Sequence, residues 1–241
     1  MPHSRQKLIS CNENIRGISG AQLLVIRHLG FLFALTPELV PADQTLPGRA
    51  EPLLPNPQPH AVLGTPITGP WKPEQRRLRI AIGCFWGVEK MFWELDGVES
   101  TSAGYAGGQT PNPTYAEVCG GRTNHAETVE VVYDPETISL KDLVRTALEA
   151  HDPTQGYRQG NDHGTQYRSA FYPDTEEEAE QIRQWCDEYG RQLKEAGYGD
   201  MTTEVRADVD YYLAEEQHQQ YLHKVPNGYC PHHSTGVACG I

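Results

Sequence analysis

The chain of 241 residues lacks features that would place it in several classes of protein. No run approaches the roughly 20 apolar residues of a membrane-spanning helix, and the nearest candidate, residues 21–35, is interrupted by Arg27 and His28. That segment also lacks the apolar centre and small-residue cleavage site of a secretory signal. Six cysteines are too few for a disulfide scaffold, and none forms a Cys-x-x-Cys pair. We therefore expect a reducing compartment and one or two chemically active thiols.

Basic residues are also scarce. Lys and Arg total 20 against 32 Asp and Glu, which gives a formal net charge of -12 at pH 7. This charge repels phosphate backbones and anionic membrane surfaces, so it argues against nucleic acid or a membrane as the main partner. Because 38% of the residues are hydrophobic, the chain can bury a sizeable core. The composition predicts an acidic enzyme or binding domain.

Composition divides the chain into three parts. Residues 1–36 carry four basic residues and one acidic residue, which fits an organellar presequence, an extension from an extra start codon or a basic arm. Residues 37–75 hold ten of the 18 prolines. Proline blocks helix interiors and removes sheet donors, so this stretch predicts an extended arm. We expect the folded domain over residues 76–241.

Hydrophobic periodicity within that domain predicts alternating strands and helices. The core order of strand, helix, strand, strand, helix, strand favours an α+β fold, namely a ferredoxin-like two-layer α/β sandwich (split βαβ) with an irregular C-terminal tail. A helix hairpin on a different sheet order fits nearly as well. Two of the expected helices, 139–150 and 175–196, begin with a serine or a threonine in a sequence that resembles a capping box. The expected strands cover residues 78–82, 98–105, 127–134, 167–172 and 203–207, and the expected helices cover 85–95, 139–150, 175–196 and 214–222.

A cysteine stands where the first expected strand turns into the first helix, in the Gly-Cys-Phe-Trp-Gly segment at residues 83–87. Unpaired backbone N–H groups and the positive end of the helix dipole favour a thiolate there. Cys84 is therefore a candidate nucleophile, with an inert buried cysteine as the alternative. The flanking glycines favour the nucleophile because they permit close backbone approach.

Glu127 shares one face of its expected strand with Val129, Val131 and Tyr133. A carboxyl desolvated on an apolar face has a raised pKa, so it can hold a proton at neutral pH and act as a general acid. The alternative is a residue at the strand end that reaches water.

A polar loop at residues 160–168 leads into the next expected strand. Such loops concentrate binding groups, although a plain turn explains the composition equally well. His163 beside Asp162 raises the alternative of a cysteine hydrolase that uses Cys84, but no oxyanion motif accompanies them. A hydrolase would act on esters or amides and would not need Cys230.

The C-terminal tail carries Cys230 and Cys239 in a segment with little helix or strand signal. Thiols near a chain terminus suit disulfide exchange. His232 and His233 lie between them and raise the alternative of a noncatalytic zinc-binding module, but their spacing matches none of the usual zinc patterns. The remaining cysteines have no comparable context, and Cys186 lies among helix residues.

Several short motifs occur together in order. They are Gly-Cys-Phe-Trp-Gly at residues 83–87, Gly-Tyr-Ala-Gly-Gly at 104–108, Pro-Thr-Tyr at 113–115, His-Ala-Glu at 125–127, the polar loop at 160–168, and His-Gln-Gln-Tyr-Leu-His-Lys at 218–224. Together they closely resemble the A-type peptide methionine sulfoxide reductases over about residues 76–239. The Leu-Pro-Gly-Arg stretch at residues 46–49 is also similar to the N-terminal arm of longer bacterial members.

The resemblance implies reduction of the S epimer of methionine sulfoxide, in proteins and free, as a repair of oxidative damage. By that resemblance, Cys84 attacks the sulfoxide sulfur and becomes a sulfenic acid, while protonated Glu127 donates to the oxygen. The hydroxyls of Tyr115 and Tyr167 would hydrogen-bond the oxygen, and Asp162 would orient the substrate.

The resemblance also implies a pocket and a recycling route. Phe85 and Trp86 would form the apolar pocket for the S-methyl group. Cys230 would attack the sulfenic acid to give a Cys84–Cys230 disulfide, and Cys239 would exchange to give Cys230–Cys239, which thioredoxin reduces. No metal or organic cofactor is implied. We expect a monomer in the cytoplasm, with an organelle as the alternative because the N-terminal extension is basic.

Overall fold

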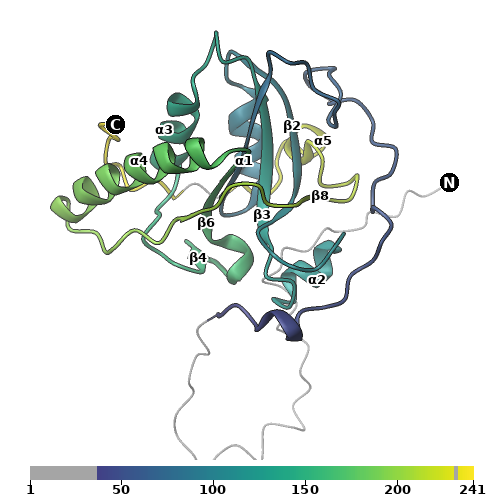
Figure 1. Ribbon diagram of the computed structural model, residues 1–241, viewed down its shortest axis with the longest axis horizontal. Coiled ribbons are helices and arrows are strands. Elements are labelled where there is room, and N and C mark those ends of the chain that lie inside the picture. Colours follow the sequence, from purple (N-terminus) through teal and green to yellow (C-terminus); the bar gives the residue numbers. More distant parts are fainter. Residues whose placement is uncertain (1–36, 231–232) are drawn as a thin grey trace, which may run out of the picture.

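The computed structural model describes residues 37–230 and 233–241. Its central sheet has the strand order β7-β6-β1-β3-β2-β8, in which only the pairing of β6 with β7 is parallel (Figure 1). A mostly antiparallel sheet flanked by helices is the α+β class that the sequence predicts. The strands of the sheet are β1 (Arg76–Ile82), β2 (Val98–Ala106), β3 (Ala126–Tyr133), β6 (Ser169–Pro173), β7 (Glu204–Val205) and β8 (Tyr211–Leu213), and β4 (Arg158–Gln159) pairs with β5 (Asp162–His163) in a separate hairpin.

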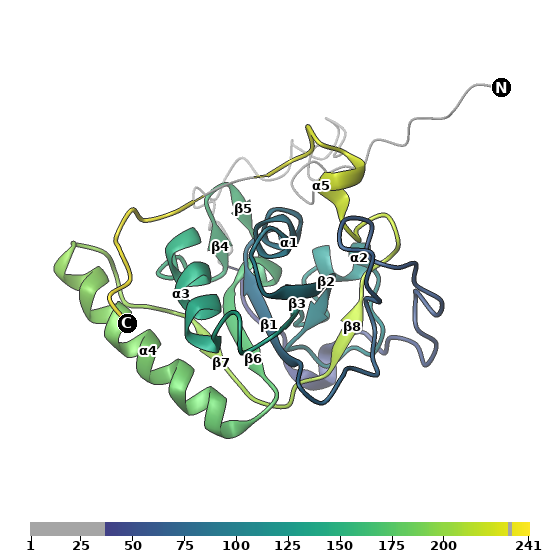
Figure 2. The ribbon, with the colours of Figure 1, turned by 90° about the horizontal axis from the view of Figure 1, so that it is seen from above.

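Helices α1 (Phe85–Trp93), α3 (Leu140–Ala150) and α4 (Glu176–Glu195) pack on one face of the sheet (Figure 2). Successive strand residues face opposite sides, so Leu78 and Ile80 join the main core under these helices, whereas Ala81 joins a smaller cluster on the other face. Two of the helix starts follow the sequence signals. Ser139 forms a complete capping box with Asp142 before α3, and Thr175 accepts a hydrogen bond from the N–H of Glu178 at the start of α4.

Parts of the secondary structure differ from the sequence prediction. The expected strand 167–172 begins only at Ser169, because the preceding residues form the 3-10 turn η3 (Thr165–Tyr167). The expected helix 214–222 is wrong for most of its length, and only α5 (Tyr221–Lys224) is helical. Gln220 before it has a left-handed backbone with φ 46, which ends any continuous helix there. The strand β8 and the helix α2 (Tyr115–Cys119) were not predicted from the sequence, and the expected strand 203–207 is reduced to β7.

Residues 37–75 run along the domain with one short 3-10 turn, η2 (Ala42–Gln44). Hydrogen bonds attach this arm at several points. The Arg49 guanidinium donates to both carboxylate oxygens of Glu117 at 2.8 and 2.9 Å, and it lowers the pKa of Glu117 to about 2. Farther along, Nε2 of His60 lies 2.8 Å from Oγ1 of Thr101 on β2. Residues 1–36 lie outside the described part of the chain. Among the described residues, no helix is long and apolar enough to cross a membrane.

Candidate active site

Cys84 is the N-cap residue of α1, at the position that the sequence predicts. The preceding Gly83 has φ +107, and a Cβ there would lie 3.0 Å from the Gln159 side chain, so glycine permits both the turn and the close approach. The expected lowering of the Cys84 pKa is wrong for this structure. Burial raises the pKa of the thiol well above its usual value and the charge of Glu127 adds to the rise, while a hydrogen bond with the Trp86 backbone opposes it. Desolvation therefore outweighs the helix terminus.

Glu127 lies on β3, which pairs with β2 in the register Tyr105 to Glu127. The residue is only 1% exposed, as its place on the apolar face predicts. Its Oε2 accepts a hydrogen bond from the backbone N–H of Phe85 at 3.1 Å, whereas Oε1 is buried and has no partner among the described residues. Burial raises the pKa of Glu127 to about 8, the Phe85 N–H opposes the rise, and the charge of Asp162 adds to it. The carboxyl is therefore largely protonated at neutral pH.

Aromatic rings line the side of α1 next to Cys84. Phe85 and Trp86 are 1% and 2% exposed, and the ring of Tyr115 stacks on both at centroid distances of 6.2 and 6.3 Å. The Trp86 ring also stacks on Tyr221 at 4.1 Å. Nε1 of Trp86 donates a hydrogen bond to Nδ1 of His218 at 3.1 Å. These contacts fix an apolar wall at the start of α1.

Tyr167 and Asp162 approach the same place from the polar loop. The Tyr167 side chain is buried, and its pKa is raised by burial and then by the charges of Glu127, Tyr115, Asp162 and Cys84, which shows that these groups share one site. Burial raises the pKa of Asp162, and a hydrogen bond from Tyr229 opposes the rise. Both carboxylate oxygens of Asp162 lie 3.0 Å from the Tyr229 hydroxyl.

The two tail cysteines occupy different surroundings. Cys230 is half-buried against the main core, and its charge adds to the rise in the pKa of Cys84, which indicates that it lies near the site. Cys239 lies against α3 and α4, near the chain end marked in Figure 2. Its backbone N–H donates to Oε1 of Glu149 at 2.7 Å, and the next N–H, of Gly240, donates to Oε1 of Gln192 at 2.9 Å. Burial raises the pKa of Cys239 to about 11. The structure thus brings together every predicted site residue except Cys239.

The alternatives gain little from this geometry. His163 is exposed on β5, while its neighbour Asp162 is buried, so the two side chains do not converge on Cys84 as a hydrolase base and its partner. Within residues 37–230 and 233–241, no group of three or more His, Cys, Asp or Glu side chains could hold a metal ion. His232, which the zinc alternative would use, lies outside the described residues.

Three residues of the site were not predicted individually from the sequence. Tyr229 binds Asp162, and His218 packs on Tyr115 at a ring distance of 4.4 Å. Glu215 accepts hydrogen bonds from the Tyr115 backbone N–H at 2.9 Å and from the Tyr105 hydroxyl at 3.0 Å. The sequence marks two of them only by where they stand: His218 begins the motif at residues 218–224, and Tyr229 precedes Cys230.

Comparisons with known proteins identify the family of this chain. A family model described as peptide methionine sulfoxide reductase matches residues 76–238. The peptide methionine sulfoxide reductase MsrA of Corynebacterium efficiens is 65% identical over 215 residues, which cover 88% of this chain and 99% of the relative. The protein of the same name from Corynebacterium glutamicum (strain ATCC 13032) is 61% identical over 215 residues, which also cover 88% of this chain and 99% of the relative.

Solved structures agree with the sequence relatives. Methionine sulfoxide reductase A of Corynebacterium diphtheriae superposes with a TM-score of 0.77 at 56% identity, covering 85% of this chain and 99% of that chain. The reduced form of Mxr1 from Saccharomyces cerevisiae has a TM-score of 0.62 at 34% identity, covering 68% of this chain and 94% of that chain. The fold and the thiol–carboxyl site define an oxidoreductase that acts on sulfur. The chain belongs to the peptide methionine sulfoxide reductase family.

Proposed function

We propose that the protein reduces the S epimer of methionine sulfoxide, in peptides and free, through a sulfenic acid on Cys84. The observation that carries the proposal is the buried carboxyl of Glu127 beside the first turn of α1. Its pKa of about 8 keeps it protonated at neutral pH. Because Oε2 accepts the Phe85 N–H, the proton belongs on Oε1, which has no other partner among the described residues. A proton held there is available to a bound sulfoxide oxygen.

The reaction transfers the oxygen from one sulfur to the other. Cys84 attacks the sulfoxide sulfur and forms a bond to it while Glu127 donates its proton to the oxygen, and the thiol proton returns to Glu127. The hydroxyl then moves to Sγ of Cys84 as the bond between the two sulfurs and the bond between the substrate sulfur and the oxygen break, which releases methionine. The hydroxyls of Tyr115 and Tyr167 hydrogen-bond the oxygen and stabilise the charge that develops on it. The sulfoxide is reduced by two electrons to methionine, and the Cys84 thiol is oxidised by two electrons to the sulfenic acid.

Selection of one epimer, proposed to be S from the family resemblance, is supported by three groups that would each take one substituent of the sulfur. The aromatic wall of Phe85 and Trp86 takes the S-methyl group, and Glu127 takes the oxygen. Asp162 orients the remaining substituent, which leads to the peptide. The other epimer, with its oxygen kept at Glu127, would bring the peptide substituent to the aromatic wall and the methyl group to Asp162, so one configuration is favoured.

Recycling is proposed to use the tail and thioredoxin. The Cys230 thiol attacks the sulfenic acid, releases water and forms the Cys84–Cys230 disulfide. Cys239 then displaces Cys84 to give Cys230–Cys239, which thioredoxin reduces with two electrons. Because Cys239 is held against α3 and α4, the tail must leave that position before the exchange.

We also infer finer features of the architecture. The inner strand order β6-β1-β3-β2 supports a ferredoxin-like split βαβ core, with α1 and α3 as its two crossing helices. Residues 37–75 are proposed to serve as an arm of the catalytic unit 76–241. The hydrogen bonds of Arg49 with Glu117 and of His60 with Thr101 support this.

A single-turnover reaction tests the proposed function. Reduced protein is mixed with one equivalent of the S sulfoxide of a methionine peptide without any reductant, and methionine and thiols are counted. We expect about one methionine per chain, a loss of two thiols, and no methionine from the R sulfoxide. Absence of methionine from folded protein with an alkylatable Cys84 would contradict the proposal.

A further inference from the structure

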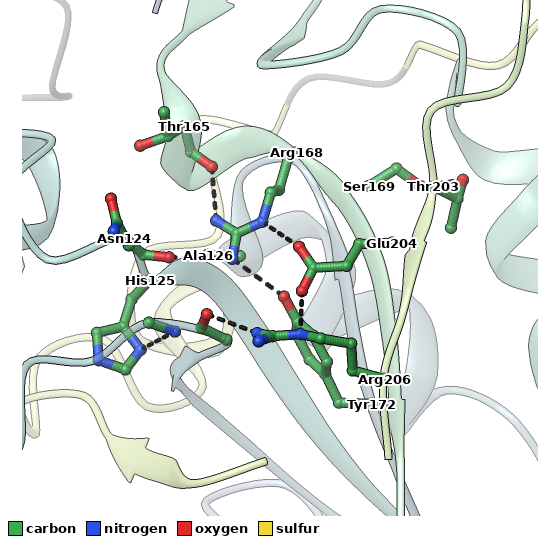
Figure 3. A network of polar contacts seen from close by, with 12 residues as sticks. Asn124, His125, Ala126, Thr165, Arg168, Ser169, Tyr172, Thr203, Glu204 and Arg206 are labelled. Atoms are coloured by element: carbon green, nitrogen blue, oxygen red, sulfur yellow. Dashed lines mark hydrogen bonds and ion pairs between the residues drawn. The ribbon is translucent and has the colours of Figure 1, made fainter. Parts of the chain in front are cut away.

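A buried arginine, Arg168, directly follows the turn that ends at Tyr167 and lies at the centre of a network of polar contacts (Figure 3). The Arg168 side chain is only 4% exposed. Its Nη1 donates to the backbone carbonyl of Thr165 at 2.9 Å, and its Nη2 donates to the carbonyl of Asn124 at 3.0 Å and to the hydroxyl of Tyr172 at 3.2 Å. Its Nε donates to Oε2 of Glu204 at 2.9 Å. One planar guanidinium thus joins four separate points of the fold.

The charge of Arg168 is compensated by Glu204 on β7, whose other oxygen forms an ion pair with Arg206. Arg206 in turn donates to the carbonyl of Gly107 at 2.6 Å. Gly107 has φ +82, and a Cβ there would lie 2.2 Å from the Tyr172 hydroxyl and 2.7 Å from Nη2 of Arg168. A buried ion pair is often no more stabilising than apolar residues of the same volume. The stability of the folded protein therefore does not explain why this position holds charged rather than apolar residues.

The network connects two groups that the proposed chemistry needs. Thr165 begins the turn η3 that ends at Tyr167, and Asn124 lies three residues before Glu127. The carbonyls of Thr165 and Asn124 are bound by different nitrogens of one rigid fork. The turn that carries the Tyr167 hydroxyl is thereby fixed relative to the segment that leads to the Glu127 carboxyl.

We propose that Arg168 is a positioning residue that holds the Tyr167 hydroxyl at the correct distance from Glu127, so that both groups meet the sulfoxide oxygen together. This inference rests on the proposed function. Lysine cannot replace the arginine, because its ammonium is a point charge without the planar fork that spans two carbonyls. A displacement of about 1 Å in a reacting group can cost on the order of 100-fold in rate.

A double-mutant cycle tests the proposal, with single-turnover formation of methionine at saturating S sulfoxide as the readout. Arg168→Lys and Tyr167→Phe are each expected to slow the reaction about tenfold or more. The double variant is expected to be no slower than the slower single variant, because Arg168 acts through Tyr167. In contrast, a double variant of Arg168→Lys and Tyr115→Phe should lose rate by the product of the two single losses. The proposal is overturned if the rate losses of Arg168→Lys and Tyr167→Phe multiply in their double variant. It is also overturned if the rate losses of Arg168→Lys and Tyr115→Phe do not multiply in theirs.

Arg79→Lys is the matched control. Arg79 is also buried and ion-paired, with Glu130 at 2.9 Å, but it has no hydrogen bond to the Tyr167 turn. Its variant should keep the single-turnover rate within about twofold, and Arg168→Lys should keep the alkylation rate of Cys84 within about twofold. If Arg168→Lys does not fold, the cycle is run with Glu204→Gln, which is expected to show the same pattern with a smaller loss.

The outcomes separate this inference from the proposed function. A wild-type protein that forms methionine, combined with multiplying losses for Arg168→Lys and Tyr167→Phe, overturns the positioning role only. A wild-type protein that forms no methionine overturns the proposed function and this inference with it.

Discussion

The carboxyl of Glu127 is joined directly to the helix start that carries Cys84. Its Oε2 accepts a hydrogen bond from the backbone N–H of Phe85, the residue after Cys84, at 3.1 Å. This contact commits one carboxyl oxygen as an acceptor and leaves Oε1 for the proton. Burial keeps that proton in place up to a pH of about 8. The proposed nucleophile and its proposed acid are therefore held by the same turn of α1.

Replacing Glu127 by glutamine should slow reduction of the sulfoxide by at least about 100-fold, because general acid catalysis typically contributes that much or more. Glutamine still accepts the Phe85 N–H, so the first turn of α1 should keep its shape. Single-turnover formation of methionine measures the loss, and thiol–disulfide exchange of Cys84 with a small disulfide serves as the control. The exchange should proceed at least as fast as in the wild type. An unchanged reduction rate would reject the acid role.

The raised pKa of Glu127 should make the free energy of unfolding depend on pH. The pKa of Glu127 is about 8 in the folded protein, against an ordinary value of 4.5, so the folded state binds more protons between these pH values. The free energy of unfolding contributed by this group therefore falls as pH rises from about 4.5 to about 8. Since Glu127→Gln removes the effect, the variant should gain stability relative to the wild type between pH 5 and pH 9, on the order of a few kcal/mol.

Denaturant unfolding at both pH values measures that gain, and Glu117→Gln provides the control. The pKa of Glu117 is lowered to about 2, so its contribution is fully present above about 4.5 and is lost only in acid. The difference between that variant and the wild type should stay constant from pH 5 to pH 9. A constant difference for Glu127→Gln as well would show that its carboxyl is ionised in the folded protein.

Replacing Cys230 by serine should separate chemistry from recycling. The variant should form about one methionine per chain and keep Cys84 as a sulfenic acid that a dimedone reagent traps. It should not turn over with thioredoxin. Cys84→Ser is the matched control and should form no methionine. Multiple thioredoxin-driven turnovers by the Cys230 variant would remove that residue from the recycling route.

The docked tail should protect Cys239 in the reduced protein. Cys239 is 6% exposed, and the Tyr189 hydroxyl donates to the carbonyl of Val237 at 3.0 Å, two residues before it. Tyr189→Phe keeps the ring but removes this contact, so it should raise the rate of Cys239 alkylation severalfold. Mass spectrometry of partly alkylated protein measures the rate, with Cys230 as the internal reference. Equal Cys239 rates in both proteins would show that the contact does not hold the tail.

Local signals predicted much of this site. The glycines around Cys84 and the periodicity after it place the cysteine at the helix start, and strand alternation alone puts Glu127 on a buried face. The capping residue Ser139 likewise marks the start of α3. Each of these features depends on neighbours within a few positions in the sequence, which is why periodicity and capping rules reach them.

Features set by distant contacts could not be predicted in this way. The helix terminus should lower the Cys84 pKa, but burial desolvates the thiol and reverses the direction. Tyr167 lies in a 3-10 turn rather than a strand, and that turn is bound by Arg168, which also binds a carbonyl 44 positions away. The expected helix around residue 218 is broken because the Gln219 side chain bonds the backbone of Ala103 on β2. Sequence periodicity does not indicate which distant residues will contact each other in the fold.

The most direct test of the central claim is a coupled assay with thioredoxin, thioredoxin reductase and NADPH, in which the S and R sulfoxides of one methionine peptide are offered separately. We predict NADPH consumption with the S epimer alone, with the amount consumed equal to the methionine formed. Consumption with the R epimer at a comparable rate would contradict the arrangement of aromatic wall and acid around Cys84. Silence with both epimers, in folded protein with a reactive Cys84, would contradict sulfoxide reduction itself.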